Sequence, residues 1–229
     1  MAILITGGAG YIGSHTCVEL LNAGYEVIVL DSLSNSKAES LKRVKEITGK
    51  ELKFYKTDLL NRRELEMVFI ENYIDAVIHF AGLKAVSESI KVPLRYYHNN
   101  FIGTLILCEV MQKYGVKKIV FSSSSTVYGV PKCVPISENF SLRATNPYGR
   151  TKLMIEEMLR DLYVADNSWS ISILRYFNPI GAHPSWRIGE DPKSTPKNLM
   201  TNITQVAIGK LKELMVLGND YPTVDGKGV

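Results

Sequence analysis

The sequence predicts an α/β protein with a doubly wound parallel sheet, followed by a partial, smaller C-terminal lobe. Short apolar runs alternate with longer helical patterns, as in repeated strand–helix units. A glycine-rich loop follows the first run, and an acidic residue ends the second. Together these features are typical of a sheet that binds a ligand along one edge.

The predicted strands are short runs rich in β-branched and aromatic residues. Most are apolar without strict alternation, as expected when helices cover both faces of a parallel sheet. They are AILIT (2–6), EVIVLD (26–31), LKFYKTD (52–58), DAVIHFAG (75–82), KKIVFSSSS (117–125) and SISILRYFN (170–178).

Helical patterns fill the intervals between these strands. Ser36 precedes Glu39, and Asn61 precedes Glu64, both at the spacing of a capping box that starts a helix. The predicted helices cover 12–23, 37–48, 62–73, 94–114 and 148–166.

The character of the chain changes after about residue 178, which divides it into 1–177 and 178–229. The stretch NPIGAHPSWRIGEDPKSTPKN is rich in Pro and Gly and predicts a long loop. An amphipathic helix near 199–213, a short LMVL strand and the turn GNDYPTVDGKG follow. We expect this second part to be an incomplete lobe.

Composition excludes several kinds of partner. The net charge of +4 is small and the basic residues are scattered, so no nucleic-acid surface is expected. No apolar run approaches the ~18 residues that cross a bilayer, and no signal peptide is recognisable, which favours a cytoplasmic protein without a membrane partner. Cys17, Cys108 and Cys133 are too widely spaced for a disulfide framework or a zinc site. The first two lie in apolar runs, where inert core residues are expected.

The glycine loop ILITGGAGYIGSH opens the first predicted helix. Gly8, Gly10 and Gly13 fit G-x-G-x-x-G, while Gly7, Gly10 and Gly13 fit G-x-x-G-x-x-G. A side chain here would keep a pyrophosphate away from the helix N-terminus, so the loop predicts a Rossmann dinucleotide site. Asp31, at the end of the second strand, would bind both ribose hydroxyls and repel a 2′-phosphate, which favours NAD over NADP. A glycine turn that only packs helix on sheet is the alternative.

The ends of the third to fifth predicted strands supply further edges of the same crevice. Asp58 ends the third strand and is placed to accept a hydrogen bond from an adenine amine. FAGLK (80–84) supplies small residues at the end of the fourth, with Lys84 beyond them, and SSSST (122–126) supplies hydroxyls at the end of the fifth. The serines fit equally well as a polar strand end that caps the next turn.

Tyr148 and Lys152, in NPYGRTKLM, lie one helical turn apart on one face. Alone, they fit an ordinary amphipathic helix start. A tyrosine has a pKa near 10, and a neighbouring ammonium and a positive nicotinamide ring would lower that pKa. With a serine hydroxyl to share the proton, the pair predicts proton removal from an alcohol while NAD+ takes a hydride.

The histidines predict no metal site. His79 lies in an apolar strand and fits a packed core residue better than a base. His15 and His183 show no ligand spacing.

These motifs resemble the extended short-chain dehydrogenases/reductases, and within them the NAD-dependent epimerase/dehydratase family, over essentially the whole chain. HFAGLKAV together with YFNPIGAHP and GNDYPT is similar to members that invert C4 of UDP-hexoses. The other shared segments are TGGAGYIGSHT, YYHNN, FSSSSTVYG, NPYGRTK, GEDP and NLM.

The resemblance implies interconversion of UDP-glucose and UDP-galactose, in galactose metabolism, by transient oxidation at C4 with tightly bound NAD. Tyr148, assisted by Ser124, would remove the 4-hydroxyl proton, while Lys152 holds the nicotinamide ribose. The substrate would be a UDP-hexose and the assembly a homodimer, in which the helices at 94–114 and 148–166 would face one another. The apolar positions of these helices fit packing on the sheet alone equally well. Residues 1–177 would bind NAD, and 178–229 would form part of the nucleotide-sugar lobe.

The implied site residues follow from motif matches. The cofactor-binding set is Gly7, Gly10, Tyr11, Ile12, Gly13, Asp31, Ser32, Asn35, Ser36, Asp58, Leu59, Phe80, Ala81, Gly82, Lys84, Asn99, Ser124, Tyr148, Lys152 and Phe177. The substrate-binding set is Ser124, Tyr148, Asn178, Asn198, Leu199, Met215, Val216 and Leu217.

Two alternatives stay open: another NAD-dependent nucleotide-sugar epimerase or dehydratase, and a catalytically silent NAD-binding remnant. Thr126 and Val127 stand where dehydratases usually carry Asp-Glu, which speaks against dehydration. The sequence departs from the family at Trp186, where Gly is usual, and at Lys197 and Thr201. Family members usually continue for roughly a hundred residues beyond this end point, which suggests a shortened chain.

Overall fold

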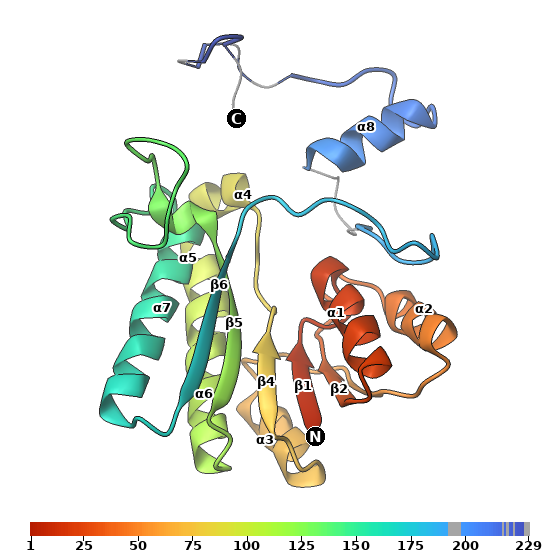
Figure 1. Ribbon diagram of the computed structural model, residues 1–229, viewed down its shortest axis with the longest axis vertical. Helices are drawn as coiled ribbons and strands as arrows, with labels where there is room; N and C mark the ends of the chain where they lie inside the picture. Colours follow the sequence, from red (N-terminus) through yellow and green to blue (C-terminus); the bar gives the residue numbers. More distant parts are fainter. Residues whose placement is uncertain (192–197, 217, 219, 222, 227–229) are drawn as a thin grey trace.

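The computed structural model describes residues 1–191, 198–216, 218, 220–221 and 223–226. Its centre is a 6-stranded sheet in the order β3-β2-β1-β4-β5-β6, in which every neighbouring pair is parallel (Figure 1). The strands are β1 (Ala2–Thr6), β2 (Glu26–Leu30), β3 (Lys53–Tyr55), β4 (Ala76–His79), β5 (Lys118–Ser124) and β6 (Ser170–Tyr176). The order runs outward in both directions from β1 and β4, so the predicted doubly wound fold is confirmed.

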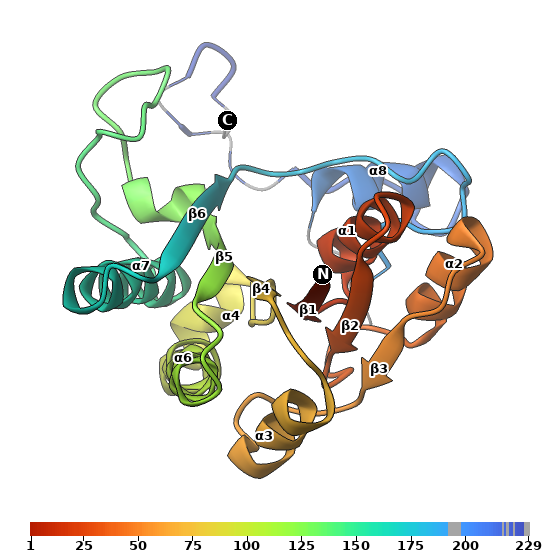
Figure 2. The same cartoon turned by 60° about the horizontal axis from the view of Figure 1, so that its bottom comes forward.

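Helices cover both faces of this sheet (Figure 2). Successive strand residues belong to different packed clusters, one on each face. On one face α1 (Tyr11–Asn22) and α2 (Glu39–Thr48) pack against a cluster that includes Ile5 and Val29. On the other face, Leu4 and Phe121 belong to a second cluster. The helices there are α3 (Arg62–Glu71), α6 (Gly103–Lys113) and α7 (Pro147–Ala165).

The helix predicted over 94–114 is present as one helical run from 93 to 113, but its middle is π-helical, which the sequence did not predict. The structure has α5 (Pro93–Tyr96), then a π-helical turn (Tyr97–Ile102), and only then α6. The unpredicted α4 (Val86–Lys91) precedes them and ends before Val92, because the residue preceding a proline disfavours helical geometry.

The cap predictions had different outcomes. Asn61 caps α3, accepting a hydrogen bond from the Glu64 N–H at 3.3 Å, as predicted. Ser36 does not cap α2, which starts after Ala38; its hydroxyl instead donates to Asp31 Oδ1 at 2.8 Å. A side-chain hydrogen bond to a nearby carboxylate has replaced the bond to the helix N-terminus.

Beyond β6 the chain leaves the sheet, and α8 (Leu199–Ala207) lies beyond the carboxyl ends of the strands (Figure 1). This helix is shorter than the predicted 199–213 because Gly209 adopts a left-handed φ of 72° just after it. Residues 214–216 are not in a strand, so the predicted LMVL strand was wrong over its described part, and Leu217 lies outside the described residues.

Cys17 and Cys108 are buried, free thiols within the two packed clusters. Burial raises the pKa of each to about 12, so both are protonated and the expected inert core role is confirmed. In the described part of the chain, no helix is long and apolar enough to cross a membrane.

Candidate active site

The glycine loop is a backbone surface that side chains would fill. Gly7 has a left-handed φ of 71°, and a Cβ on it would lie 2.7 Å from the Ala81 backbone nitrogen. A Cβ on Gly13 would lie 2.4 Å from the Gly7 carbonyl oxygen. The N-cap of α1, Gly10, places no side chain over the free N–H groups of the first turn. This bare helix N-terminus fits the pyrophosphate of a dinucleotide.

Asp31 is buried directly after β2 and joins the glycine loop to the segment that follows β2, around the predicted ribose position. Its Oδ2 accepts a hydrogen bond from the Ala9 N–H at 3.0 Å, and its Oδ1 accepts from the Leu33 N–H and the Ser36 hydroxyl, both at 2.8 Å. A carboxylate can accept about four hydrogen bonds, so Asp31 retains capacity for a ligand hydroxyl. The residue therefore both shapes the loop and fits a ribose.

The remaining predicted cofactor residues lie around the same edge with different exposure. Leu59 is buried, and Tyr11, Ile12, Ser32, Phe80, Ala81 and Asn99 are half-buried. Asn35, Asp58, Gly82, Lys84 and Phe177 are exposed.

Contacts from the segment after β6 reach two of these residues. The Tyr11 hydroxyl donates to the Gly181 carbonyl at 2.7 Å, and Lys84 pairs with Glu190 at 2.8 Å. Burial and the Glu190 charge raise the pKa of Tyr11. The loop after β6 is thus attached to the predicted cofactor edge.

Ser124 ends β5, and its hydroxyl is oriented by Thr126, a role that the sequence did not indicate. Its Oγ accepts hydrogen bonds from the Thr126 N–H at 3.2 Å and from the Thr126 hydroxyl at 2.9 Å. A hydroxyl has two lone pairs and one proton, so these bonds occupy the lone pairs and leave the proton to donate. The alternative that these serines cap the next turn is therefore correct for the Ser124 oxygen. The Ser124 proton is still free to be donated to a reacting group.

Tyr148 lies in the first turn of α7, which begins with a good cap. The Asn146 side chain accepts from the Gly149 N–H at 2.8 Å, and Pro147 occupies the first helical position. Burial raises the pKa of Tyr148, and a hydrogen bond with Ser124 opposes that rise. The net direction is upward, opposite to the expected lowering, because desolvation penalises the phenolate.

Lys152 is buried one turn further along α7. Its Nζ donates to the Ser122 carbonyl at 2.7 Å and lies 5.9 Å from the centroid of the Tyr148 ring. Burial lowers the pKa of Lys152 to about 8. The structure thus brings Ser124, Tyr148 and Lys152 together beside the end of β5, with a hydroxyl, a phenol and an ammonium in one small volume.

His79 is a core residue, as predicted. Its ring is buried, with Nδ1 2.6 Å from the Thr6 hydroxyl and Nε2 2.8 Å from the Thr104 hydroxyl. Burial, and then the charge of Lys152, lower its pKa to about 3. Among the described residues, no group of His, Cys, Asp and Glu is arranged to hold a metal ion.

The predicted substrate-binding residues that follow β6 lie at the surface in the described part of the chain. Asn178 and Leu199 are exposed, as are Met215 and Val216, and Leu217 lies outside the described residues. Asn198 donates to the Glu190 carboxylate at 2.5 Å, so it shares that acid with Lys84.

Two of the departures from the family pattern can be placed. Trp186 has a left-handed φ of 61° and is 91% exposed, so a position where relatives usually carry Gly retains the backbone conformation that Gly favours. The Thr201 hydroxyl donates to the Asn198 carbonyl at 2.7 Å. Lys197 lies outside the described residues.

Three features lie at one edge of the doubly wound sheet: the glycine loop, the buried Asp31, and the cluster of Ser124, Tyr148 and Lys152. Together they define a class of protein, the dinucleotide-dependent enzymes that act on an alcohol. The family model "NAD dependent epimerase/dehydratase family" matches residues 3–226. The chain therefore belongs to that family. This confirms the predicted family, the fold class and NAD as the cofactor.

Particular relatives are epimerases. UDP-glucose 4-epimerase of Bacillus subtilis is 71% identical over 229 residues, covering 100% of this chain and 68% of the relative. The Dictyostelium discoideum UDP-glucose 4-epimerase is 59% identical, covering 99% and 66%. The crystal structure of UDP-glucose 4-epimerase from Bifidobacterium longum with NAD+ and UDP superposes with a TM-score of 0.97 at 55% identity, covering 100% and 68%. The chain thus groups with isomerases, and it spans about two thirds of the length of these relatives.

Proposed function

We propose that this protein interconverts UDP-glucose and UDP-galactose by transient oxidation at C4 of the hexose, as a step of galactose metabolism. The observation that carries the proposal is the convergence of Ser124, Tyr148 and Lys152 at the end of β5, on the sheet edge that also carries the glycine loop. The identity to named UDP-glucose 4-epimerases supports the choice of substrate.

The proposed site divides into two parts along the boundary at residue 177. Residues 1–177 form the NAD-binding domain, in which the glycine loop holds the pyrophosphate and Asp31 the ribose. Residues 178–229 form part of the nucleotide-sugar lobe, to which Asn178, Asn198 and Met215 contribute. Bound NAD+ supplies reversible oxidation at the sugar carbon, so the reaction has no net redox change.

The chain's own residues manage the proton. Tyr148 accepts the proton of the 4-hydroxyl and later returns it, and the Ser124 hydroxyl donates to the Tyr148 oxygen and favours its ionised form. Lys152 favours the phenolate electrostatically. Because burial raises the pKa of Tyr148 in the protein alone, this help is needed for ionisation near neutral pH.

The test is to purify the 229-residue chain, release bound NAD by denaturation, measure it by absorbance, and assay conversion of UDP-galactose. A Tyr148→Phe variant should retain NAD and lose turnover, because it keeps the ring and loses the ionisable group. Tyr163→Phe, at an exposed position on the same helix, is the matched control and should behave like the parent. Undiminished turnover in Tyr148→Phe would contradict the proposed base.

Two other functions remain testable in the same assay. A catalytically silent NAD-binding protein would retain NAD without turnover of any UDP-sugar, and the exposure of Leu199 and Met215 favours this alternative. Another nucleotide-sugar epimerase would convert a different UDP-hexose, including an N-acetylated one.

We further propose a homodimer formed through α7 and the π-helical turn. A shallow groove of about 470 Å³ runs along this face. Its lining is Phe101, Met154, Glu157, Met158, Asp161, Leu162 and Ala165. Light scattering across a concentration series should give twice the chain mass, and Met158→Glu should halve it. The free thiols suit a reducing compartment, so a cytoplasmic location is proposed as well.

A further inference from the structure

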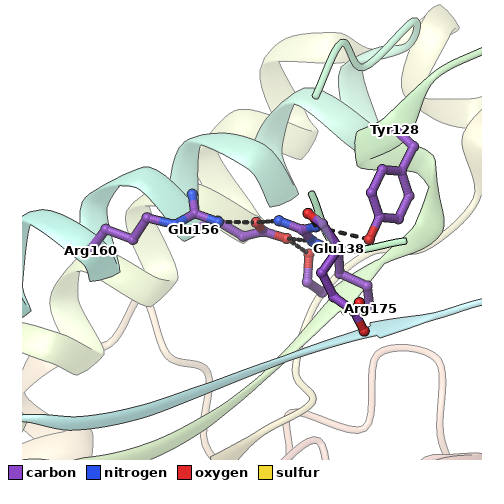
Figure 3. Close-up of polar contacts among 6 residues, drawn as sticks. Tyr128, Glu138, Glu156, Arg160 and Arg175 are labelled. Carbon is purple, nitrogen blue, oxygen red and sulfur yellow. Dashed lines mark hydrogen bonds and ion pairs between the residues drawn. The ribbon is translucent and has the colours of Figure 1, made fainter. Parts of the chain in front are cut away.

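A completely buried carboxylate, Glu156, lies on α7 one turn after Lys152, and polar side chains surround it (Figure 3). Its Oε1 accepts from the Ser123 hydroxyl at 2.5 Å and from Arg175 Nε at 3.0 Å. Its Oε2 accepts from Arg175 Nη2 at 2.7 Å and from Arg160 Nη2 at 2.8 Å. Burial opposes its ionisation, but the bonds from Arg175 and Ser123 outweigh burial and lower the pKa of Glu156. Glu156 is therefore a charged carboxylate in the core, and both of its oxygens accept hydrogen bonds.

Arg175 extends these contacts to the segment that follows Ser124. It lies on β6 directly opposite Ser123 in the strand register. Besides holding Glu156, its Nη1 donates to the Tyr128 hydroxyl at 2.9 Å and to the Glu138 carbonyl at 3.3 Å. Tyr128 ends a short 3-10 helix (Ser125–Tyr128) whose N-cap is Ser124, so one guanidinium holds both strands and this turn together.

Glu156 also completes a repeat on α7. Tyr148, Lys152 and Glu156 recur at four-residue spacing and therefore lie on one face of the helix. Each contacts one of three consecutive serines at the end of β5. Lys152 donates to the Ser122 carbonyl, Glu156 accepts from the Ser123 hydroxyl, and the Ser124 hydroxyl lies near enough to Tyr148 to oppose the rise in the Tyr148 pKa. Side chains of α7 therefore contact three successive residues at the end of β5, the last of which is Ser124 beside Tyr148.

Stability alone does not account for this cluster, because a buried ion pair is often no more stabilising than apolar side chains of the same volume. A forked, two-oxygen pairing does provide fixed geometry. Reaction rates depend steeply on that geometry, since a misplacement of about 1 Å can cost about 100-fold.

We propose that Glu156 and Arg175 are positioning residues, which hold the end of β5 against α7 and thereby set the contact between Ser124 and Tyr148. The inference rests on the proposed function, because the contact matters only if Tyr148 exchanges a proton.

The test compares Ser123→Ala, Glu156→Gln and Arg175→Lys in the NAD-loaded chain. Ser123→Ala removes one bond from the cluster and keeps the charged pair, so it is the mildest change. The first measurement is the titration of tyrosinate by its ultraviolet absorbance. From the titration curve of each variant we subtract the curve of the same variant that also carries Tyr148→Phe, so that the difference reports Tyr148 alone. We expect Tyr148 to ionise about one pH unit higher in each variant, because the Ser124 hydrogen bond that favours the phenolate is lengthened.

The second measurement is kcat and KM for UDP-galactose. We expect kcat to fall by about 10-fold or more with KM little changed, because binding groups are untouched. Lys117→Gln is the matched control: Lys117 pairs with Asp166 at 2.7 Å and joins β5 to the far end of α7. It should lower the melting temperature without moving the Tyr148 titration.

The outcomes separate this inference from the proposed function. A parent chain without turnover refutes the proposed function, while the titration still decides the positioning role. An unchanged Tyr148 titration in folded Ser123→Ala and Arg175→Lys overturns the inference, as does an equal shift in Lys117→Gln. If Glu156→Gln does not fold, the other two variants carry the decision.

Discussion

The Lys152 ammonium donates a 2.7 Å hydrogen bond to the backbone carbonyl of Ser122, so a buried cation is held by the main chain of β5. Its Nζ also lies 4.8 Å from the centroid of the Phe121 ring. Neither partner carries a full negative charge. Desolvation therefore dominates, and the pKa of Lys152 falls to about 8.

Replacing Lys152 with Met should change how stability depends on pH. Between the folded pKa of about 8 and the ordinary value of 10.5, the unfolded chain holds a proton that the folded chain has released. Stability contributed by this group therefore rises with pH in that window, by up to about 1.4 kcal/mol per pH unit, and Lys152→Met should lack the rise. Urea unfolding of cofactor-free protein at pH 7 to 10 measures it.

The quantity to compare is the difference between parent and variant. The raised pKa values of Cys17 and Cys108 make both proteins lose stability at alkaline pH, and this common effect cancels. A difference that stays constant from pH 7 to 10 would contradict the depressed pKa of Lys152.

Thr126→Val should reduce turnover while leaving NAD bound. The substitution removes the hydroxyl that donates to Ser124 Oγ at 2.9 Å, so the serine proton is no longer directed. We expect kcat to fall by about 10-fold, a part of the ~10²–10⁴-fold that positioned proton transfer contributes. Thr126→Ser keeps the donor and should restore the rate; if it is as slow as Thr126→Val, the orienting role is wrong.

Gly13→Ala should abolish retention of NAD. Its Cβ would lie 2.4 Å from the Gly7 carbonyl oxygen and 2.7 Å from the Gly8 Cα, and backbone cannot give way as a flexible side chain does. The control is Gly24→Ala, where a left-handed φ of 87° gives strain of about 1 kcal/mol but nothing lies within 4 Å. Absorbance of released NAD distinguishes the two, and equal NAD in Gly13→Ala and parent would refute the glycine loop as the NAD site.

His79 should make stability fall as the solution is acidified. Its pKa is about 3 in the folded chain and 6.5 ordinarily, so below about pH 6.5 the unfolded chain binds a proton that the folded chain does not. The contribution is present above pH 6.5 and is lost as pH falls toward 3, by up to about 1.4 kcal/mol per pH unit.

The measurement is the slope of unfolding free energy against pH between 5 and 6.5. His79→Gln should flatten that slope, whatever its effect on stability at neutral pH. His98→Gln, at an exposed position, should leave it unchanged. Parallel slopes in His79→Gln and parent would show that the ring titrates normally.

Local patterns were sufficient for the sheet and the glycine loop. Each of the six strands predicted up to residue 178 exists, because in runs such as EVIVL the same residues have a high β propensity and are buried. The course of the helices was predicted less accurately from the sequence. The π-helical turn and the end of α8 at Gly209 depend on local backbone geometry that hydrophobic periodicity does not record.

The sequence by itself determined the fold class, through its alternating strand and helix patterns. It also predicted the glycine loop as the NAD site and Tyr148 with Lys152 as a neighbouring pair, because each is a contiguous motif with fixed spacing. Only the tertiary structure decided which groups surround them. Thr126 orients Ser124, while Glu156 meets Ser123 and Arg175 across three elements. The direction of the Tyr148 pKa also depends on burial. Such contacts and desolvation arise from distant segments brought together by folding, which no local spacing encodes.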